Sequence, residues 1–285
     1  MGNLGEDTAV EGSDGRYTAA FHKDWEIWGP NGGYVAAVAL RAAGVHSSQP
    51  RPASLVCHYL GVGAFDAVDI EAVSLRTSKR AESVRVSITQ KGNAIAEALV
   101  WCVADDLSGL SHDALPMPEV AKPADLKSVD QLRAEEGVPQ PPFGFWRNLE
   151  ERPPNWLPWE EFVARGEFRH EMQTWMKFRP QATFENDPFV DACRSVIMID
   201  TWQWPAASRG YKPGTLTHTA PSLDLAVSFH ALDPSAEWLL VNATSPYAAD
   251  GLVGGRAELW SEAGVLLATG GQQMLCRPLP PNPRG

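Results

Sequence analysis

One segment of this chain constrains the fold more than any other. Residues Tyr34–Gly44 are apolar on nearly every side, rich in alanine and closed by a glycine, which is typical of a buried helix of about three turns. Strand-like stretches rich in valine and isoleucine follow at residues 53–60, 67–76, 82–90 and 94–104. A buried helix followed by consecutive antiparallel strands predicts a sheet wrapped around that helix.

The same pattern occurs a second time. A strand is expected at Thr174–Arg179 and a helix from Pro188 to about Trp202, and further strands at residues 217–231, 237–245, 251–261 and 265–277. Residues 53–55 align with residues 221–223, and residues 92–96 align with residues 264–268. We therefore infer a duplication of one helix-plus-strands unit, and an α+β fold class.

The duplication suggests a division of the chain. We expect an N-terminal extension at residues 1–19 with a loose end, a first unit at 20–104, a connector at 105–173, a second unit at 174–278 and a tail at 279–285. The connector is rich in proline and carries Trp146, Trp156 and Trp159. Because a solvated linker rarely contains three tryptophans, we expect it to be ordered and packed against a domain.

Composition excludes several classes of protein. The 285 residues are 44% hydrophobic and carry a formal net charge of −11, which fits a globular protein and argues against nucleic acid as the main partner. The longest apolar run, Val35–Leu40, is too short to span a membrane, and the first residues do not resemble a secretory signal. Cytoplasmic localisation is expected.

Cysteine and histidine spacing gives no sign of a metal site. The four cysteines are isolated, no C-x-x-C or H-E-x-x-H occurs, and reduced thiols are expected. We expect no metal and no cofactor.

The two copies differ in polarity. In the alignment, Asp224 and Gln272 of the second copy stand opposite Val56 and Val100 of the first. Polar groups thus replace core residues in the second copy alone. By pattern alone, Asp224, Gln272 and Thr244 could equally be solvent-facing strand residues. The glycines beside Gln272 would let a ligand or another backbone approach closely.

The chain resembles the acyl-CoA thioesterase II family, whose members consist of two tandem hotdog domains. In the first half, residues 28–34 with the helix that follows, residues 75–80 and residues 90–92 carry the resemblance. In the second half, residues 222–224, 237–240, 244–245, 264–268 and 272–277 match the family in order and spacing. The resemblance implies a double hotdog, in which each antiparallel sheet wraps around a long central helix.

The resemblance also implies a site. The family's catalytic Asp, Thr or Ser, and Gln fall by motif on Asp224, Thr244 and Gln272, which would activate a water molecule to hydrolyse an acyl-CoA thioester. One departure is Leu225, where better-known members have histidine directly after the aspartate. A homodimer of double hotdogs is expected from the family.

Substrate-binding residues are predicted at the start of the first helix and in a basic cluster. Backbone N–H groups of Gly32 and Gly33 could stabilise an oxyanion, and Tyr34 follows them. Arg80, within a cluster of basic residues, is expected to contact the phosphates of coenzyme A. The two alternatives are a hotdog hydratase or dehydratase, disfavoured because residues 31–43 offer only Asn31 and Arg41 as polar groups, and a non-catalytic acyl-thioester-binding protein.

Overall fold

The computed structural model describes residues 1–279, so nearly all of the predicted tail 279–285 lies outside the described residues. The α-helices are α1 Leu4–Asp7, α2 Gly32–His46, α3 Val129–Glu136, α4 Trp159–Arg165 and α5 Pro188–Arg209. The strands are β1 Glu11–Ser13, β2 Arg16–Ala20, β3 Arg51–Tyr59, β4 Ala67–Thr77, β5 Ala81–Gln90, β6 Asn93–Val103, β7 Leu149–Arg152, β8 Glu171–Phe178, β9 His218–Thr219, β10 Asp224–Phe229, β11 Leu239–Ala249, β12 Leu252–Ser261, β13 Leu266–Leu275 and β14 Arg277–Pro278. Short 3₁₀ turns lie at Lys23–Trp25, Pro123–Asp125 and Gly144–Asn148.

The sheet confirms that the chain contains one unit twice. Its twelve strands run in the order β1-β2-β4-β5-β6-β3-β10-β13-β12-β11-β8-β7, and every pairing is antiparallel. On the two sides of the β3–β10 pair, corresponding strands follow in the same order: β3-β6-β5-β4-β2 in the first half and β10-β13-β12-β11-β8 in the second. Each half has a strand before its helix that pairs with the second strand that the twelve-stranded sheet gains after the helix, namely β2 with β4 and β8 with β11, since β9 pairs only with β14. This is the predicted double hotdog, joined edge to edge by β3 and β10.

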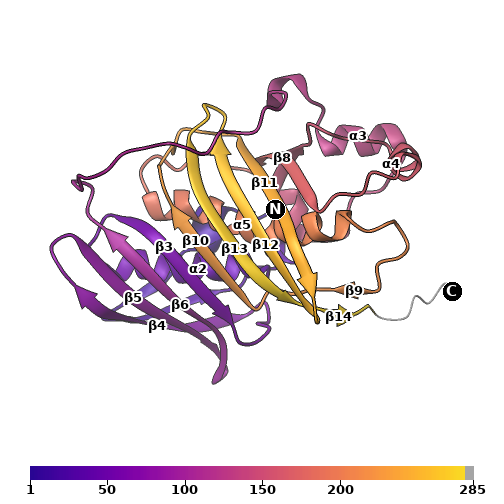
Figure 1. Cartoon of the computed structure of the whole chain (residues 1–285). Coiled ribbons are helices and arrows are strands. Elements are labelled where there is room, and N and C mark those ends of the chain that lie inside the picture. The colour runs from indigo at the N-terminus through magenta and orange to yellow at the C-terminus, as the bar shows by residue number, and fades with distance from the viewer. Residues whose placement is uncertain (280–285) are drawn as a thin grey trace.

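The two central helices form the core. Figure 1 shows β10, β13 and β12 in front of α5, and α2 behind the strands of the first half. α2 is buried on nearly every side, as its alanine-rich sequence predicts, because α5 covers the part that the sheet leaves free. Small side chains allow this close packing of two helices inside one curved sheet.

The N-terminal residues differ from the expected loose end. Leu4 of α1 is only 2% exposed, and the Gly2 N–H donates to Asn148 Oδ1 at 2.8 Å. β1 and β2 form a hairpin that extends the sheet beyond β4. Residues 1–19 are therefore ordered despite their polar composition, because backbone pairing and a few apolar contacts hold the segment in place.

The predicted connector is ordered. It supplies β7, which pairs with β8, and Phe145, which is fully buried. The Trp146 ring packs against Trp202 of α5 with centroids 5.7 Å apart. Trp159, in contrast, is 61% exposed. Within residues 1–279 we find no helix with the length and hydropathy needed to cross a membrane.

Candidate active site

A buried carboxyl group, Asp200, lies where the two central helices meet. Its residue is 6% exposed, and its Oδ2 accepts a hydrogen bond from the backbone N–H of Gly33 at 2.7 Å. The N-cap residue Asn31 accepts from the Tyr34 N–H, and its Nδ2 lies 3.4 Å from the same Oδ2. The first turn of α2 thus presents backbone and side-chain donors to the carboxylate, at the helix end whose dipole favours negative charge.

Glycine at position 33 makes this approach possible. A Cβ on Gly33 would lie 2.7 Å from the Ile197 Cα and 3.0 Å from the Asp200 Cβ, which is closer than packed atoms tolerate. A Cβ on Gly32 would lie 3.1 Å from both carboxylate oxygens of Asp200. The glycine pair predicted to bind substrate therefore lies at the site, and one of its N–H groups is already bonded to Asp200.

Two further polar side chains complete the cluster from the sheet. The hydroxyl of Ser222 lies 3.1 Å from Asp200 Oδ1 and 2.9 Å from Gln272 Oε1. The amide nitrogen of Gln272 donates to the backbone carbonyl of Asp200 at 3.2 Å. Because a hydroxyl has one hydrogen, Ser222 can donate to only one of these two acceptors at a time.

Burial changes the acidity of Asp200. Desolvation raises its pKa to about 6, although hydrogen bonds from Gly33, Ser222 and Asn31 act in the opposite direction. A carboxylate with this pKa is mostly ionised at pH 7 and is a stronger base than an exposed aspartate. These are the properties required of a general base.

Tyr59, at the end of β3, lies beside the cluster. Its ring carbon Cζ is 3.2 Å from the position that a Cβ on Gly32 would occupy. Its hydroxyl oxygen is shielded from solvent and has no hydrogen-bond partner among residues 1–279. Burial and the nearby Asp200 charge hold the pKa of Tyr59 well above its usual range, so the hydroxyl stays a donor.

The structure does not bring the three predicted catalytic residues together. Gln272 points inward and belongs to the cluster around Asp200. Asp224 lies on the outer face of the sheet, where its Oδ1 accepts from the Gln273 N–H at 2.9 Å. Leu225, which follows it, is fully buried. Successive strand residues point to opposite faces, so a buried Leu225 forces its neighbour outward.

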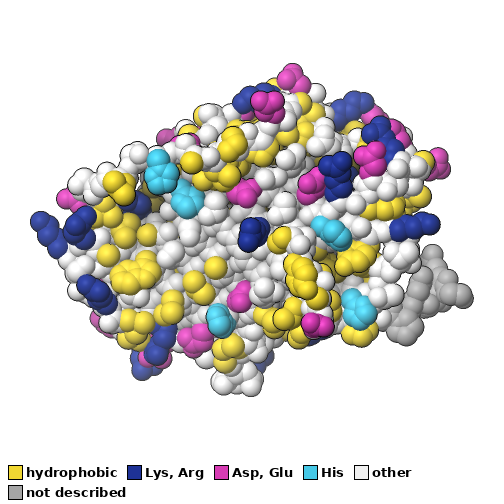
Figure 2. Space-filling model, viewed as in Figure 1, with side chains coloured by type: hydrophobic (Ala, Val, Ile, Leu, Met, Phe, Trp, Pro, Cys, Tyr) yellow, Lys and Arg dark blue, Asp and Glu magenta, His cyan; other side chains and the backbone are white. Residues whose placement is uncertain are grey.

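Thr244 also lies on the outer face. It stands between Ala243 and Ser245, which are both buried, and pairs across the sheet with Arg256 and Glu171. Figure 2, which views the molecule as in Figure 1, shows few charged side chains over the middle of this face. Asp224 and Thr244 are therefore separated from Gln272 by the sheet itself, which corrects the expectation that the three share one site.

Ser222 reaches the inner face through an irregularity that no alternation pattern predicts. Ser222 bridges to Met274, whereas Ala226 pairs with Gly271, so the register shifts by one residue between them. An uninterrupted alternation from the buried residues Leu225 and Val227 would place Ser222 outside. The shift turns its hydroxyl toward α5.

The remaining predicted binding residues lie elsewhere. Tyr34 is fully buried, and its hydroxyl donates to the Asp7 carbonyl at 2.7 Å, so it fastens the N-terminal segment to α2. Arg80 lies in the exposed turn between β4 and β5. That turn is held to the opposite end of α2, because Gln49 Nε2 donates to the Ser78 carbonyl at 3.2 Å. In this chain Arg80 is therefore remote from Gly33.

Sequence reasoning missed Asp200 and Ser222. A signal for Asp200 existed, since it is an acidic residue directly after the apolar stretch Val196–Ile199 in a helix expected to be buried. Ser222 stood in the motif that carried the resemblance, two residues before the aspartate that was chosen. Within residues 1–279, no group of three or more His, Cys, Asp or Glu side chains could hold a metal ion.

Comparison with known proteins gives the family. Residues 21–103 match the family described as the acyl-CoA thioesterase N-terminal domain. Residues 123–276 match the acyl-CoA thioesterase C-terminal domain. The chain belongs to the acyl-CoA thioesterase family.

Solved structures share the fold of this family member over its whole length. A hot dog fold protein of unknown function from Alicyclobacillus acidocaldarius is 21% identical, with a TM-score of 0.78 and coverage of 97% of this chain and 98% of that one. A putative thioesterase II from Thermobifida fusca is 18% identical, with a TM-score of 0.77 and the same coverage. An acyl-CoA thioesterase II from Mycobacterium marinum is 20% identical, with a TM-score of 0.74 and coverage of 98% of both chains.

Proposed function

We propose that this protein hydrolyses acyl-CoA thioesters with a water molecule activated by Asp200 and positioned by Ser222 and Gln272. The observation that carries the proposal is the hydrogen-bonded cluster of these three side chains against the first turn of α2. Membership of the acyl-CoA thioesterase family supplies the substrate class. This set of residues replaces the predicted set of Asp224, Thr244 and Gln272.

Asp200 acts as the general base. Its carboxylate removes a proton from water while the hydroxide oxygen bonds to the thioester carbonyl carbon. When the carbon–sulfur bond breaks, the same proton passes from Asp200 to the sulfur, so free acid and CoA leave and the carboxylate is restored. A pKa of about 6 suits both steps, because the group is mostly ionised at pH 7 and still acidic enough to return the proton.

Ser222 and Gln272 fix the position of the water. Each offers a hydrogen-bonding atom within 3.2 Å of Asp200 or of the other, so a water bound to one is within reach of the others. Holding the water in one orientation lowers the entropic part of the activation free energy.

The carbonyl oxygen needs donors as it gains negative charge. Two candidate donors are the hydroxyl of Tyr59, which has no hydrogen-bond partner among residues 1–279, and the N–H of Gly32 at the first position of α2. The first N–H groups of a helix have no partner within the helix, and the dipole at that end favours an anion. We assign both to the oxyanion.

Exposed apolar side chains next to these residues give a place for the acyl chain. Trp28 is 62% exposed and lies three residues before Asn31, and Leu60, at 55%, follows Tyr59. Leu223, at 39%, follows Ser222. These three residues adjoin site residues in the sequence, and exposed apolar groups beside polar residues are characteristic of ligand entrances, so we propose that the acyl chain enters here.

The proposal is tested by thiol release from a panel of acyl-CoAs, from acetyl to palmitoyl and including aromatic acyl groups. Asp200→Asn should lower kcat by about 10² or more, as expected for loss of a general base. Asp224→Asn makes the same chemical change on the outer face and should leave kcat within about twofold. If Asp224→Asn removes activity and Asp200→Asn does not, the motif-based set is right and this proposal is refuted. If the wild type binds acyl-CoA without releasing thiol, the protein is the non-catalytic binding module.

A further inference from the structure

A cavity lies on the other side of α5 from Asp200. Its volume is about 1110 Å³, and it is lined by residues of α3, α4, β7, the start of β8, the end of α5 and the segment that follows α5. Arg209, which lines it, follows Asp200 by nine residues, or about two and a half helical turns, so the two side chains point to opposite faces of α5. The cavity is therefore a site separate from the Asp200 cluster.

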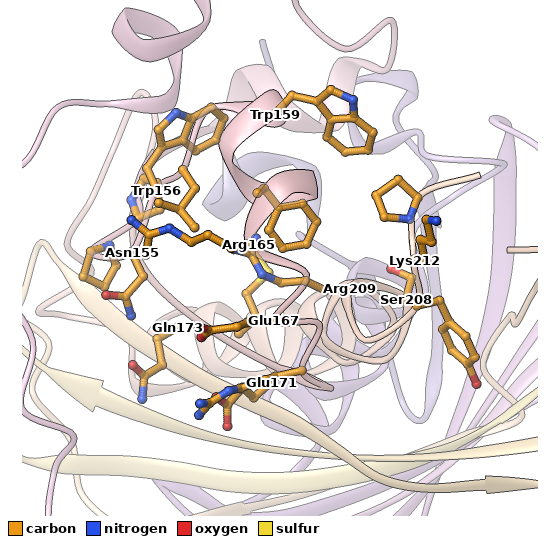
Figure 3. A pocket seen from close by; sticks show the side chains of 18 of the residues that line it. Asn155, Trp156, Trp159, Arg165, Glu167, Glu171, Gln173, Ser208, Arg209 and Lys212 are labelled. Atoms are coloured by element: carbon orange, nitrogen blue, oxygen red, sulfur yellow. The ribbon is translucent and has the colours of Figure 1, made fainter. Parts of the chain in front are cut away.

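Aromatic side chains from the connector form one wall. Figure 3 shows Trp156 and Trp159 on one side of the cavity, with Ser208 and Lys212 on another and Arg209 between them. Trp156 is held in place because its Nε1 donates to Glu136 Oε1 at 2.8 Å. Two of the connector tryptophans, unexplained by the thioesterase site, thus present indole rings to one cavity.

The opposite side carries cations without acidic partners. Among residues 1–279, Arg209 and Lys212 have no carboxylate within 4.0 Å. The Arg209 guanidinium lies 4.8 Å from the Phe162 ring centroid, a cation–π contact that leaves its N–H groups free. Arg165 and Arg169 of the same cavity are paired, with Glu161 at 2.5 Å and Glu171 at 3.5 Å.

Glu151, a carboxyl group that lines the cavity and interacts electrostatically with Arg209, is partly neutral. Desolvation raises the pKa of Glu151 to about 7, and its Oε1 accepts from the Thr174 hydroxyl at 3.1 Å. Around neutral pH it therefore cancels only part of the charge of Arg209, and an anion can approach. Arg133 adds a guanidinium whose Nη1 donates to the Pro139 carbonyl at 2.9 Å and whose Nε is buried without a partner among residues 1–279.

We propose that this cavity binds a purine nucleoside phosphate, with the base against the tryptophans and the phosphates at Arg209 and Lys212. Indole rings stack on bases, and arginine and lysine are the residues that bind phosphate. One candidate ligand, CoA, rests on the proposed function, because CoA contains an adenosine phosphate and is a product of the proposed hydrolysis. A free nucleotide such as ADP has the same chemistry, and binding experiments distinguish the two.

The test is calorimetric titration of the full-length protein with ADP and, separately, with free CoA. We expect one ADP per chain, with affinity lowered about tenfold or more by Arg209→Gln combined with Lys212→Ala, since charge-assisted contacts are lost. Trp159→Leu, at an exposed position that does not hold the fold together, should weaken ADP binding as well. CoA binding that is tighter than ADP binding and is weakened by the same cavity variants identifies the product as the ligand, and the reverse order identifies a free nucleotide.

The matched control is Lys79→Ala combined with Arg80→Ala, which removes two exposed cations from the turn predicted to hold CoA phosphates. The control should leave ADP affinity unchanged. The inference is overturned if ADP fails to bind below about 1 mM and the cavity variants leave CoA binding unchanged, or if the control weakens ADP binding as much as the cavity variants do. No thioester is present, so these results stand apart from whether the protein hydrolyses acyl-CoA.

Discussion

Replacing Asp200 with asparagine should remove hydrolysis and, at neutral pH, make the protein more stable. The asparagine has the shape of aspartate and can still accept the Gly33 N–H through its Oδ1. Its amide nitrogen can donate to the Ser222 hydroxyl, which then donates its only hydrogen to Gln272. In the wild type the ionised carboxylate and the Gln272 oxygen compete for that hydrogen.

The size of the effect follows from the pKa of Asp200. Burial raises it from the ordinary value of 3.8 to about 6, which corresponds to a cost of about 3 kcal/mol for keeping the folded protein ionised. Because the folded state binds the proton more tightly than the unfolded state, the free energy of unfolding falls as pH rises from about 4 to about 6. Asparagine removes this cost, so the variant gains up to about 3 kcal/mol above pH 6 and little below pH 4.

Urea unfolding of both proteins between pH 4 and pH 8, followed by circular dichroism, measures this difference. Asp224→Asn, on the outer face, should change the free energy of unfolding by less than about 0.5 kcal/mol at pH 8. The reasoning is refuted if Asp200→Asn is less stable than the wild type at pH 8, or if its advantage does not grow with pH. Such a result would mean that the hydrogen bonds to the carboxylate outweigh its desolvation.

The other predictions concern the groups around Asp200. Ser222→Ala should lower kcat about tenfold to a hundredfold, with thiol release as the assay, because the water loses one of its fixed partners; an unchanged kcat would exclude that role. Tyr59→Phe should lower kcat with little loss of stability, since its hydroxyl makes no hydrogen bond within residues 1–279. Tyr34→Phe should do the reverse, costing about 1 kcal/mol in thermal unfolding with kcat retained, and equal effects would contradict the two assignments. Gly33→Ala should cost several kcal/mol or abolish folding, measured by thermal unfolding, because its Cβ would collide with α5.

Much of the fold was readable from local pattern. The helix expected at Tyr34–Gly44 is observed at Gly32–His46, and the four strands after it lie within two residues of their predicted limits. The second helix begins at Pro188 as expected and extends to Arg209. These predictions rest on hydrophobic periodicity, which is a property of neighbouring residues and can be recognised without the tertiary contacts.

The candidate site was only partly readable. The resemblance to the family pointed to Gln272, and the glycine-rich helix start pointed to Gly32 and Gly33; the structure brings all three beside Asp200. The sequence pattern led to Asp224 rather than to Asp200, which the structure places beside Gln272. Which acid faces the site depends on how α5 packs against α2, and the contact from Gly33 to Asp200 joins residues 167 positions apart.

The sequence by itself determined that this chain has two similar units, each with a buried helix and antiparallel strands. Burial gives each helix and strand a characteristic spacing of apolar residues, and that spacing can be read locally. Only the tertiary structure brought the groups of the candidate site together. The close crossing of two helices put a carboxylate against the N-terminus of α2, and a one-residue shift in the β10–β13 register turned Ser222 inward. Both arise from contacts between distant segments, and no local pattern encodes the side to which such a residue finally points.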